Sequence, residues 1–233
     1  METDFIYWRH PTLPGIKVEE VCGGEDKKGR LWEELALQVY CENGKDGYRE
    51  IGHFQQGAPF VNGEESRISL SHTSGLLVVA TLPATPEVEL SDFSLRAAMG
   101  VDAERLDRVE QVRRVQSKFL STAEKELVGE DGIKLIVAWT AKEAAYKAVL
   151  GDGLDLIEDI RIEQLPGVGP AVPVYEKSEF PEITYGRVIV RRQAKEESGE
   201  REEVELSLYS YESEDCIVTL AFSPKCAKFG SKF

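Results

Sequence analysis

The spacing of hydrophobic positions changes along the chain and predicts a mixture of strands and helices. Short β-rich runs predominate in the first hundred residues, and a "TSG" turn joins two of them. One helical stretch, residues 29–41, interrupts these runs with apolar side chains at Leu31, Leu35 and Val39. The predicted strands of this part are residues 5–8, 47–54, 66–72, 75–82 and 95–104.

The second part of the chain is predicted to begin with helices and to end with strands. Residues 105–120 carry an apolar side chain at every third position, and Ser121 followed by Glu124 is a capping-box pattern for a second helix. A third helix is predicted to end at Gly151, and a Pro/Gly loop follows at residues 165–173. The remaining predicted elements are the third helix itself, 137–151, the strands 183–192, 202–211 and 215–223, and a charged hairpin turn at 193–201. The whole pattern predicts an α+β chain with strands and helices in both halves.

Composition is consistent with a folded protein outside the membrane. With 233 residues and 42% hydrophobic content, the chain can bury the core of one large domain or two small ones. No run approaches the roughly 18 apolar residues of a membrane span, and the acidic start lacks the basic and apolar regions of a signal peptide. Four scattered cysteines without a CxxC pair indicate reduced thiols. We therefore expect a cytoplasmic protein that does not bind membranes.

The net charge of −14 argues against general nucleic-acid binding, which draws on Lys and Arg to neutralise phosphates. An anionic ligand would therefore need a local basic site.

Three acidic residues are candidates for one metal site. Asp102 and Glu104 are two apart on a predicted strand, so their carboxylates point to the same face roughly 7 Å apart. Glu143 lies in an otherwise apolar helix, where a charged group near the core needs a partner. If the three converge, Mg²⁺ is the natural occupant, because it takes oxygen ligands and completes its shell with phosphates. Lys142 and Lys147 would then supply positive charge to those phosphates.

Each of these features also has an ordinary structural explanation. The Asp102 and Glu104 pair is typical of solvated surface. Glu143 and Lys147 lie one helical turn apart, as in a surface ion pair. At about 100° per residue, Lys142 is rotated away from that pair.

His72 is the one histidine embedded in a polar cluster, "SLSHTSG". A Ser-His-Asp hydrolase is not indicated, because no nucleophile elbow is present and the adjacent Ser71 points the opposite way on a strand. A satisfied histidine at a strand end remains the alternative.

Taken in order, four motifs resemble those of the 4'-phosphopantetheinyl transferases, specifically the monomeric surfactin-synthetase-activating type. They are "GAPF" (57–60), "ISLSHTSG" (68–75), "GVDAE" (100–104) and "WTAKEAAYK" (139–147), and the resemblance covers roughly residues 55–160. It implies a pseudo-two-fold pair of similar α+β halves, residues 1–98 and 99–233, with coenzyme A in the cleft between them. It also implies that "GDGLDLIEDIRIE" (151–163) holds the strand after the last motif.

The resemblance further implies a reaction. A serine hydroxyl of an apo acyl or peptidyl carrier protein attacks the β-phosphorus of coenzyme A, which transfers phosphopantetheine and releases 3',5'-ADP. Such a holo-acyl-carrier-protein synthase serves fatty-acid, polyketide or nonribosomal-peptide synthesis. The chain is then expected to be a monomer that uses Mg²⁺, or Mn²⁺ in its place.

Roles are carried over by position. Asp102, Glu104 and Glu143 correspond to the Mg²⁺ ligands, and Glu143 also to the general base, which must lie close to the proton it removes. Lys142 and Lys147 resemble the lysines at the pyrophosphate, with Lys147 the better placed to assist the leaving group.

Ser71 and His72 match the strand-end pair that contacts coenzyme A phosphates. Two departures concern the nucleotide end of coenzyme A: Ala58 replaces a usual lysine, and the first helix offers Leu37 or Gln38 where an arginine is usual. They favour one alternative, a weakened or inactive homologue that serves as a carrier-protein or nucleotide-binding module. A second alternative is a metal-dependent phosphohydrolase that uses the same acids with water.

The partner implied by the resemblance is acidic, because carrier proteins typically present an acidic helix. Residues 105–118 hold five basic and two acidic side chains directly after the predicted metal strand. Such a basic patch can attract an acidic partner despite the negative net charge of the chain, because salt screens charges that lie more than about 10 Å away. An ordinary amphipathic helix with a charged face is the alternative. The basic side chains are Arg105, Arg108, Arg113, Arg114 and Lys118.

Overall fold

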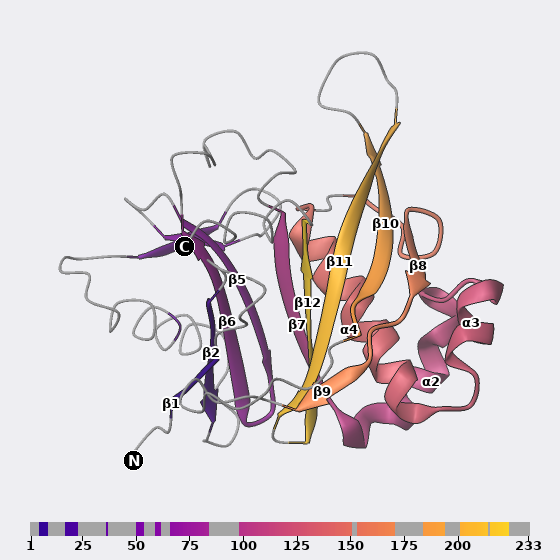
Figure 1. Ribbon diagram of the computed structural model, residues 1–233, viewed down its shortest axis with the longest axis horizontal. Coiled ribbons are helices and arrows are strands. Elements are labelled where there is room, and N and C mark those ends of the chain that lie inside the picture. Colours follow the sequence, from indigo (N-terminus) through magenta and orange to yellow (C-terminus); the bar gives the residue numbers. More distant parts are fainter. Residues whose placement is uncertain are drawn as a thin grey trace.

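The protein is described by a computed structural model in three layers: a first β-sheet, a second β-sheet, and helices on the outer face of the second sheet (Figure 1). The structure describes residues 5–8, 17–22, 36, 50–53, 59–61, 66–83, 98–150, 153–170, 184–193, 201–213 and 215–223.

The first sheet has the strand order β1-β2-β6-β5-β4-β3, and all neighbouring strands are antiparallel. Its central hairpin turns at Ser74 and Gly75, where Gly75 has φ +83°, a conformation that glycine adopts without strain. This is the turn that the sequence predicts. The strands are β1 (Phe5–Trp8), β2 (Lys17–Cys22), β3 (Ile51–His53), β4 (Pro59–Val61), β5 (Ser66–Thr73) and β6 (Leu76–Pro83).

The second sheet has the order β7-β12-β11-β10-β8, and the short strand β9 pairs in parallel with β11. Strand β7 is therefore at one edge of this sheet. The strands are β7 (Met99–Arg105), β8 (Ile160–Gln164), β9 (Val168–Pro170), β10 (Gly186–Gln193), β11 (Arg201–Ser213) and β12 (Cys216–Phe222).

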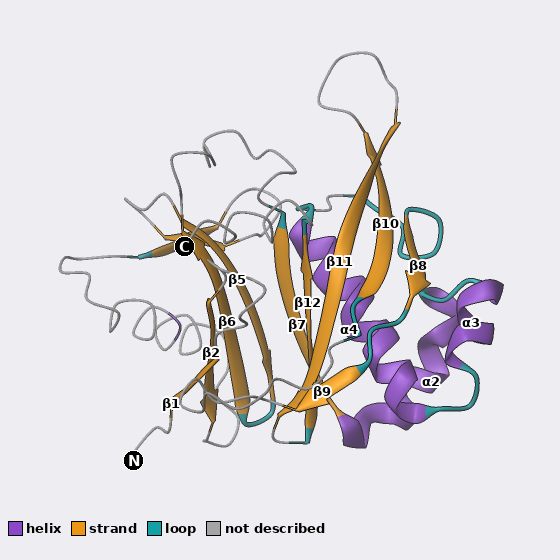
Figure 2. Cartoon of the chain, viewed as in Figure 1, coloured by secondary structure: helices purple, strands orange, loops and turns teal. Residues whose placement is uncertain are grey.

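Helices connect β7 to β8 and cover one face of the second sheet (Figure 2). Ser121 and Glu124 form the predicted capping box at the start of α3, and Asp131 caps α4 by accepting from the backbone N–H groups of Ile133 and Lys134. The helical elements are the short 3₁₀ helices η2 (Leu106–Arg108) and η3 (Gln116–Lys118) and the α-helices α2 (Val109–Val115), α3 (Thr122–Val128) and α4 (Gly132–Ala148).

Two apolar cores hold the layers together. One lies between α4 and the second sheet, where Ala141, Ala144, Ala145 and Ala148 pack closely. The other lies between the two sheets and joins side chains of β2 and β6 to side chains of β7, β11 and β12. Both faces of the second sheet are therefore buried, and α4 and the first sheet lie on opposite sides of it (Figure 1).

Most sequence-based expectations for the elements are confirmed, including the α+β class and the strand within 151–163. The sequence misses β2 and β4. The predicted loop at 165–173 is wrong at residues 168–170, which form β9. Of the predicted helix 29–41 only Ala36, which is helical, is described. The predicted helix 137–151 is found as α4, but it begins at Gly132 and ends at Ala148, before Gly151, which lies outside the described residues. The pseudo-two-fold likeness of the halves stays a prediction. Within the described ranges, no helix is long and apolar enough to cross a membrane.

Candidate active site

A pocket of about 410 Å³ opens where β5, β7 and α4 meet. The β5–β6 turn and the end of β5 form one wall, and β7, η2 and α4 form the other. The motifs at residues 68–75, 100–104 and 139–147 therefore all contribute to one pocket. Its lining residues are Ser71, His72, Thr73, Ser74, Asp102, Ala103, Glu104, Arg108, Trp139 and Glu143.

Strand β7 presents two carboxylates to this pocket. Asp102 is 8% exposed and Glu104 is 6% exposed. The alternating residues Met99, Val101 and Ala103 belong to the core against the first sheet, so the two acids share the opposite face. The expectation of a common face is confirmed.

Gly100 allows α4 to lie directly on β7. A Cβ atom at this position would be 2.2 Å from the carbonyl oxygen of Ala144 and 2.5 Å from the backbone nitrogen of Ala148. No side chain fits there without moving the helix. Because α4 carries Glu143 and Lys147, this contact sets their distance from the acids of β7.

Lys147 joins α4 to two strands from different sheets. Its ammonium lies 2.7 Å from Asp102 Oδ1, and it donates to the carbonyl oxygens of Val101 at 3.1 Å and Leu70 at 3.3 Å. All three donors of the ammonium have an acceptor. Lys147 is thus fixed beside the pocket, with its charge directed at Asp102.

Asp102 also accepts a hydrogen bond from Ser71, whose hydroxyl lies 2.8 Å from Oδ1. Ser71 and Lys147 therefore both bind the same carboxylate oxygen. In the described part of the chain, no donor reaches Oδ2.

Glu104, at the end of β7, is held by Arg108, which lies four residues further along the chain in η2. The guanidinium Nη1 is 3.2 Å from Oε1 and 2.9 Å from Oε2 of Glu104, and the backbone N–H of Arg105 donates to Oε1 at 3.0 Å. Burial nevertheless raises the pKa of Glu104 above its usual value, and the charge of Asp102 adds to this rise, against the bonds from Arg105 and Arg108.

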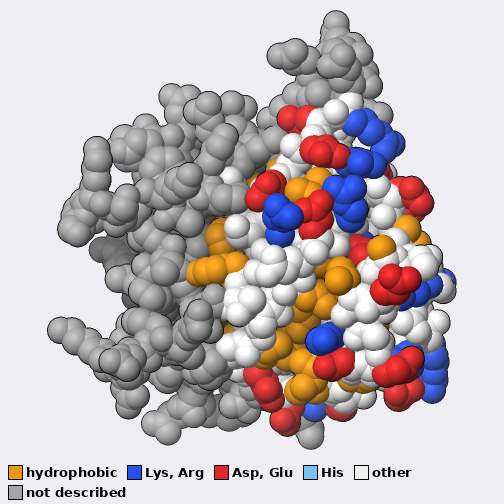
Figure 3. Space-filling model, turned by 45° about the vertical axis from the view of Figure 1, so that its right-hand side comes forward, with side chains coloured by type: hydrophobic (Ala, Val, Ile, Leu, Met, Phe, Trp, Pro, Cys, Tyr) orange, Lys and Arg blue, Asp and Glu red, His pale blue; other side chains and the backbone are white. Residues whose placement is uncertain are grey.

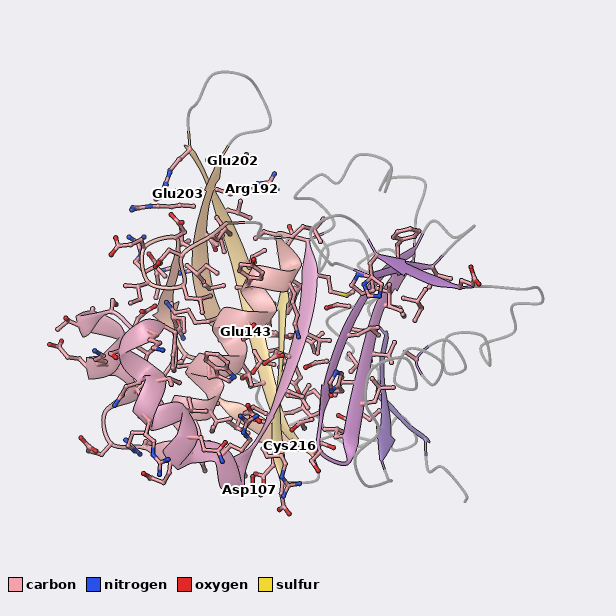
Figure 4. The ribbon with its side chains drawn as sticks, turned by 180° about the vertical axis from the view of Figure 1, so that it is seen from behind. Asp107, Glu143, Arg192, Glu202, Glu203 and Cys216 are labelled. Carbon is pink, nitrogen blue, oxygen red and sulfur yellow. The ribbon has the colours of Figure 1, made fainter. Side chains whose placement is uncertain are left out.

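Glu143 lies on the side of α4 that faces β7 (Figure 4). No described residue donates a hydrogen bond to its carboxylate or forms an ion pair with it. Burial raises its pKa above the usual value of a glutamate, the charge of Asp102 adds to the rise, and Lys147 opposes it. An ionisable carboxylate that is half-buried without a donor is a candidate proton acceptor.

His72 is exposed at the pocket wall formed by the first sheet. Its pKa lies below the usual value, first because of partial burial and then because of the charge of Lys147, while Asp102 acts in the opposite direction. The lowered pKa favours the neutral imidazole, in which one ring nitrogen donates a hydrogen bond and the other accepts one.

Lys142, one of the predicted phosphate-binding residues, does not reach the pocket. Its side chain is fully buried, and its ammonium lies 2.6 Å from Glu124 Oε1 and donates to the carbonyl oxygens of Leu156, at 2.7 Å, and Ile160. The physical reason is the helical offset from Glu143, which turns Lys142 toward α3 and β8. We therefore exclude Lys142 from the phosphate-binding set.

Three of the five basic residues in the stretch 105–118 are paired with acidic residues, two of them with acids of the stretch itself. Arg105 bonds Asp107 at 3.0 Å, Arg113 lies 3.6 Å from Glu110, and Arg108 binds Glu104.

Arg114 and Lys118 are exposed, and no acidic partner is found for either within the described residues. On the face shown in Figure 3, basic and acidic side chains are interspersed. A free positive surface is thus limited to the second half of the stretch.

The donor set suits a hard divalent cation. Asp102, Glu104 and Glu143 line one pocket and supply only carboxylate oxygens. The pKa values of the two glutamates are raised first by burial and further by the charge of Asp102, and a bound cation would favour their ionised forms. In the described ranges, no three acidic, histidine or cysteine side chains lie close enough to form a preformed metal centre. Binding a metal at all three would require the carboxylates to come closer together, and Glu104 is held by Arg108 in this structure.

Two residues that line or support the pocket were not assigned from the sequence. Trp139 lines the pocket one helical turn before Glu143, a spacing that the sequence shows. Glu124, the partner of Lys142, had no signal beyond its capping box. Ala58, Leu37 and Gln38, at which the nucleotide end of coenzyme A was considered, lie outside the described residues.

A comparison with protein families matches residues 98–196 to the 4'-phosphopantetheinyl transferase superfamily. This range contains all three pocket carboxylates and Lys147, whereas Ser71 and His72 precede it. The matched part of the chain is therefore similar to transferases that act on carrier proteins with coenzyme A as substrate. No curated protein matches the chain.

Proposed function

We propose that this chain transfers 4'-phosphopantetheine from coenzyme A to a serine of an apo acyl or peptidyl carrier protein and releases 3',5'-ADP. The observation that carries the proposal is the convergence of Asp102, Glu104 and Glu143 in one pocket with Ser71 and His72. Its volume of about 410 Å³ lies in the range of small-molecule sites.

Glu143 is the proposed general base. Its carboxylate accepts no hydrogen bond from the described residues, and burial raises its pKa, both of which suit a group that must take up a proton. In the proposed step, a Glu143 oxygen accepts the proton of the carrier serine as the serine oxygen bonds the β-phosphorus. The bond between this phosphorus and the bridging oxygen of 3',5'-ADP breaks at the same centre.

Lys147 and His72 are proposed to act on the phosphates, Lys147 through its charge, because its three donors already have acceptors within the chain, and His72 through a hydrogen bond. Lys147 carries its charge 2.7 Å from Asp102, at the edge where β5 and β7 meet, and His72 is exposed on the wall opposite Glu143. Such a step relies on position and electrostatics more than on covalent chemistry of the protein.

Asp102, Glu104 and Glu143 would hold Mg²⁺, or Mn²⁺ in its place, and the ion would stabilise negative charge on the phosphates. The residues fit this role in their chemistry, with all three donating oxygen. Arg108, which binds Glu104 in this structure, is 48% exposed and lines the same pocket.

We further propose the monomeric, surfactin-synthetase-activating type, with residues 1–98 and 99–233 as its two halves. Residues of both proposed halves line the pocket. Arg114 and Lys118 are the better candidates for contact with an acidic carrier helix, because Arg105, Arg108 and Arg113 are paired within the chain. A cytoplasmic location agrees with this substrate.

The test is to incubate the protein with an apo carrier protein, coenzyme A and Mg²⁺ and to weigh the carrier by mass spectrometry. We expect the carrier to gain the mass of one phosphopantetheine. Glu143→Gln should lower kcat/KM by about 10²- to 10⁴-fold, the usual contribution of a general base. Glu126→Gln, an exposed change on α3, is the matched control and should retain the wild-type rate.

The alternatives give different outcomes. Binding of coenzyme A and carrier without a gain in mass would indicate a binding module. Release of 3',5'-ADP from coenzyme A without any carrier would indicate a phosphohydrolase. Either result contradicts the proposed function.

A further inference from the structure

Two serines of β5 make similar contacts with the open edge of β7, but only one of them reaches Asp102. Ser69 Oγ accepts from the backbone N–H of Val101 at 3.0 Å, and Ser71 Oγ accepts from the backbone N–H of Ala103 at 3.1 Å. Both side chains are buried. The two hydroxyls thus satisfy edge donors that would otherwise lie buried without acceptors.

Ser71 has a second contact that Ser69 lacks. Its hydroxyl donates to Asp102 Oδ1 at 2.8 Å, the oxygen that Lys147 also binds at 2.7 Å. A serine hydroxyl has one proton to donate. With this proton on Asp102, Ser71 has no donor left for a phosphate of a ligand in the pocket.

The two bonds to Oδ1 fix how the carboxylate of Asp102 is turned. Ser71 approaches from β5 and Lys147 from α4, so the carboxylate is held between two elements that are far apart in sequence. Oδ2, which no described residue reaches, is left to bind a ligand. Second partners that orient metal ligands typically contribute 10- to 100-fold to metal affinity.

We propose that Ser71 is a positioning residue that presents Asp102 Oδ2 to a divalent cation, and that it does not donate to coenzyme A. The inference rests on the proposed function insofar as Asp102 is taken as a metal ligand. His72 keeps its proposed contact with phosphate, so the two adjacent residues have separate roles.

The experiment measures Mn²⁺ binding by calorimetry without coenzyme A or carrier. Ser71→Ala removes both the edge contact and the bond to Asp102, whereas the matched control Ser69→Ala removes an edge contact only. We expect Ser71→Ala to raise the dissociation constant for Mn²⁺ by about 10-fold or more, and Ser69→Ala to change it by less than about twofold. Ser71→Thr keeps the hydroxyl and should restore most of the affinity.

Equal affinities of Ser71→Ala and Ser69→Ala would overturn the inference, as would a wild-type protein that does not bind Mn²⁺. If Ser71→Ala does not fold, Ser71→Cys replaces it, because its thiol is of similar size but is a weak donor. The same loss of affinity is expected. An affinity of Ser71→Cys equal to that of the wild type would overturn the inference.

A second measurement does not depend on metal. A double-mutant cycle of Ser71→Ala and Asp102→Ala, read from the unfolding equilibrium with a chelator present, should show a coupling of at least about threefold in the unfolding constant. The corresponding cycle of Ser69 and Asp102 should show none, and equal coupling in both cycles would contradict the inference. Failure of the proposed function looks different: the wild type would bind Mn²⁺ in a Ser71-dependent manner but would transfer nothing.

Discussion

Adjacent residues of α4 occupy opposite environments. Lys142 is fully buried and paired with Glu124, while Glu143 faces the pocket without a donor among the described residues. Lys147, one turn beyond Glu143, is bound to Asp102. The helix is largely apolar because it packs on the second sheet and against α2, and Lys142, Glu143 and Lys147 each have a distinct task.

The different tasks of the two lysines can be separated by substitution. Lys142→Met leaves the buried charge of Glu124 without its partner, so we expect a loss of about 3–5 kcal/mol in the free energy of unfolding. The folded fraction should keep transferase activity within a few-fold. Lys147→Met should instead lower kcat more than stability. Denaturant unfolding and kinetics on the same samples check both, and a selective loss of activity in Lys142→Met would return this residue to the site.

Glu143 should lower the stability of the metal-free protein. Its pKa is raised in the folded state above the usual 4.5, so the ionised form is disfavoured by folding. Below about pH 4.5 the carboxyl group is protonated in both states, and folding meets no cost from its charge. As the pH rises through the folded pKa the group ionises, and the stability of the folded state falls. Glu143→Gln should therefore unfold at the same or a higher temperature at pH 7 with a chelator present, by differential scanning calorimetry. A clear drop would show that the carboxylate has a stabilising partner.

For single residues, the sequence predicts which side chains share a face of one strand or helix, but it does not predict contacts between residues far apart in the chain. Two acids two apart on a strand, and Glu143 with Lys147 four apart on a helix, follow from periodicity. The bond of Lys142 to Glu124 joins residues 18 positions apart on different helices, and no periodic pattern reports it. Ser71 and Asp102 are 31 residues apart, so their bond too required the structure.

Among the elements, β7 and α4 form the contact on which the site depends, and Gly100 permits it. We expect Gly100→Ala to cost about 1–3 kcal/mol or more, because its Cβ would overlap backbone atoms of α4 that cannot move alone. The shifted helix should also lower kcat/KM. Gly132→Ala, at the start of α4, is the control, since its Cβ meets only the side chain of Val109. Urea unfolding should show a smaller effect there, and an equal effect would refute the role of the close approach.

The missed strands have physical explanations. In β2, Val18 and Glu20 both face inward, so the buried side of the strand contains a carboxylate and does not read as an apolar face. Strands β4 and β9 have three residues each and include proline, which a sequence pattern assigns to a loop. The longer strands β10 to β12 carry enough alternating or continuous apolar positions to be found.

For the whole molecule, polar contacts join the two sheets in addition to the apolar core between them. Tyr211 and Ser213 of β11 donate to the two oxygens of Glu20 on β2, each at 2.6 Å, and Glu20 is 1% exposed. Ser71 and Lys147 make further links at the pocket. The predicted halves 1–98 and 99–233 are thus tied together at the pocket and away from it, which supports unfolding as one unit.

Removing one of these links should weaken both halves together. Tyr211→Phe takes a donor from the buried Glu20, and we expect a cost of about 1–3 kcal/mol. Far-UV circular dichroism and tryptophan fluorescence should still give one coincident urea transition, moved to lower urea, because the packed apolar face keeps the sheets in contact. Ser207→Ala on the same strand, outside the cluster, is the control and should shift the midpoint little. Two separate transitions in Tyr211→Phe would contradict this prediction. They would show that the two halves can unfold independently once the hydrogen bond from Tyr211 to Glu20 is lost.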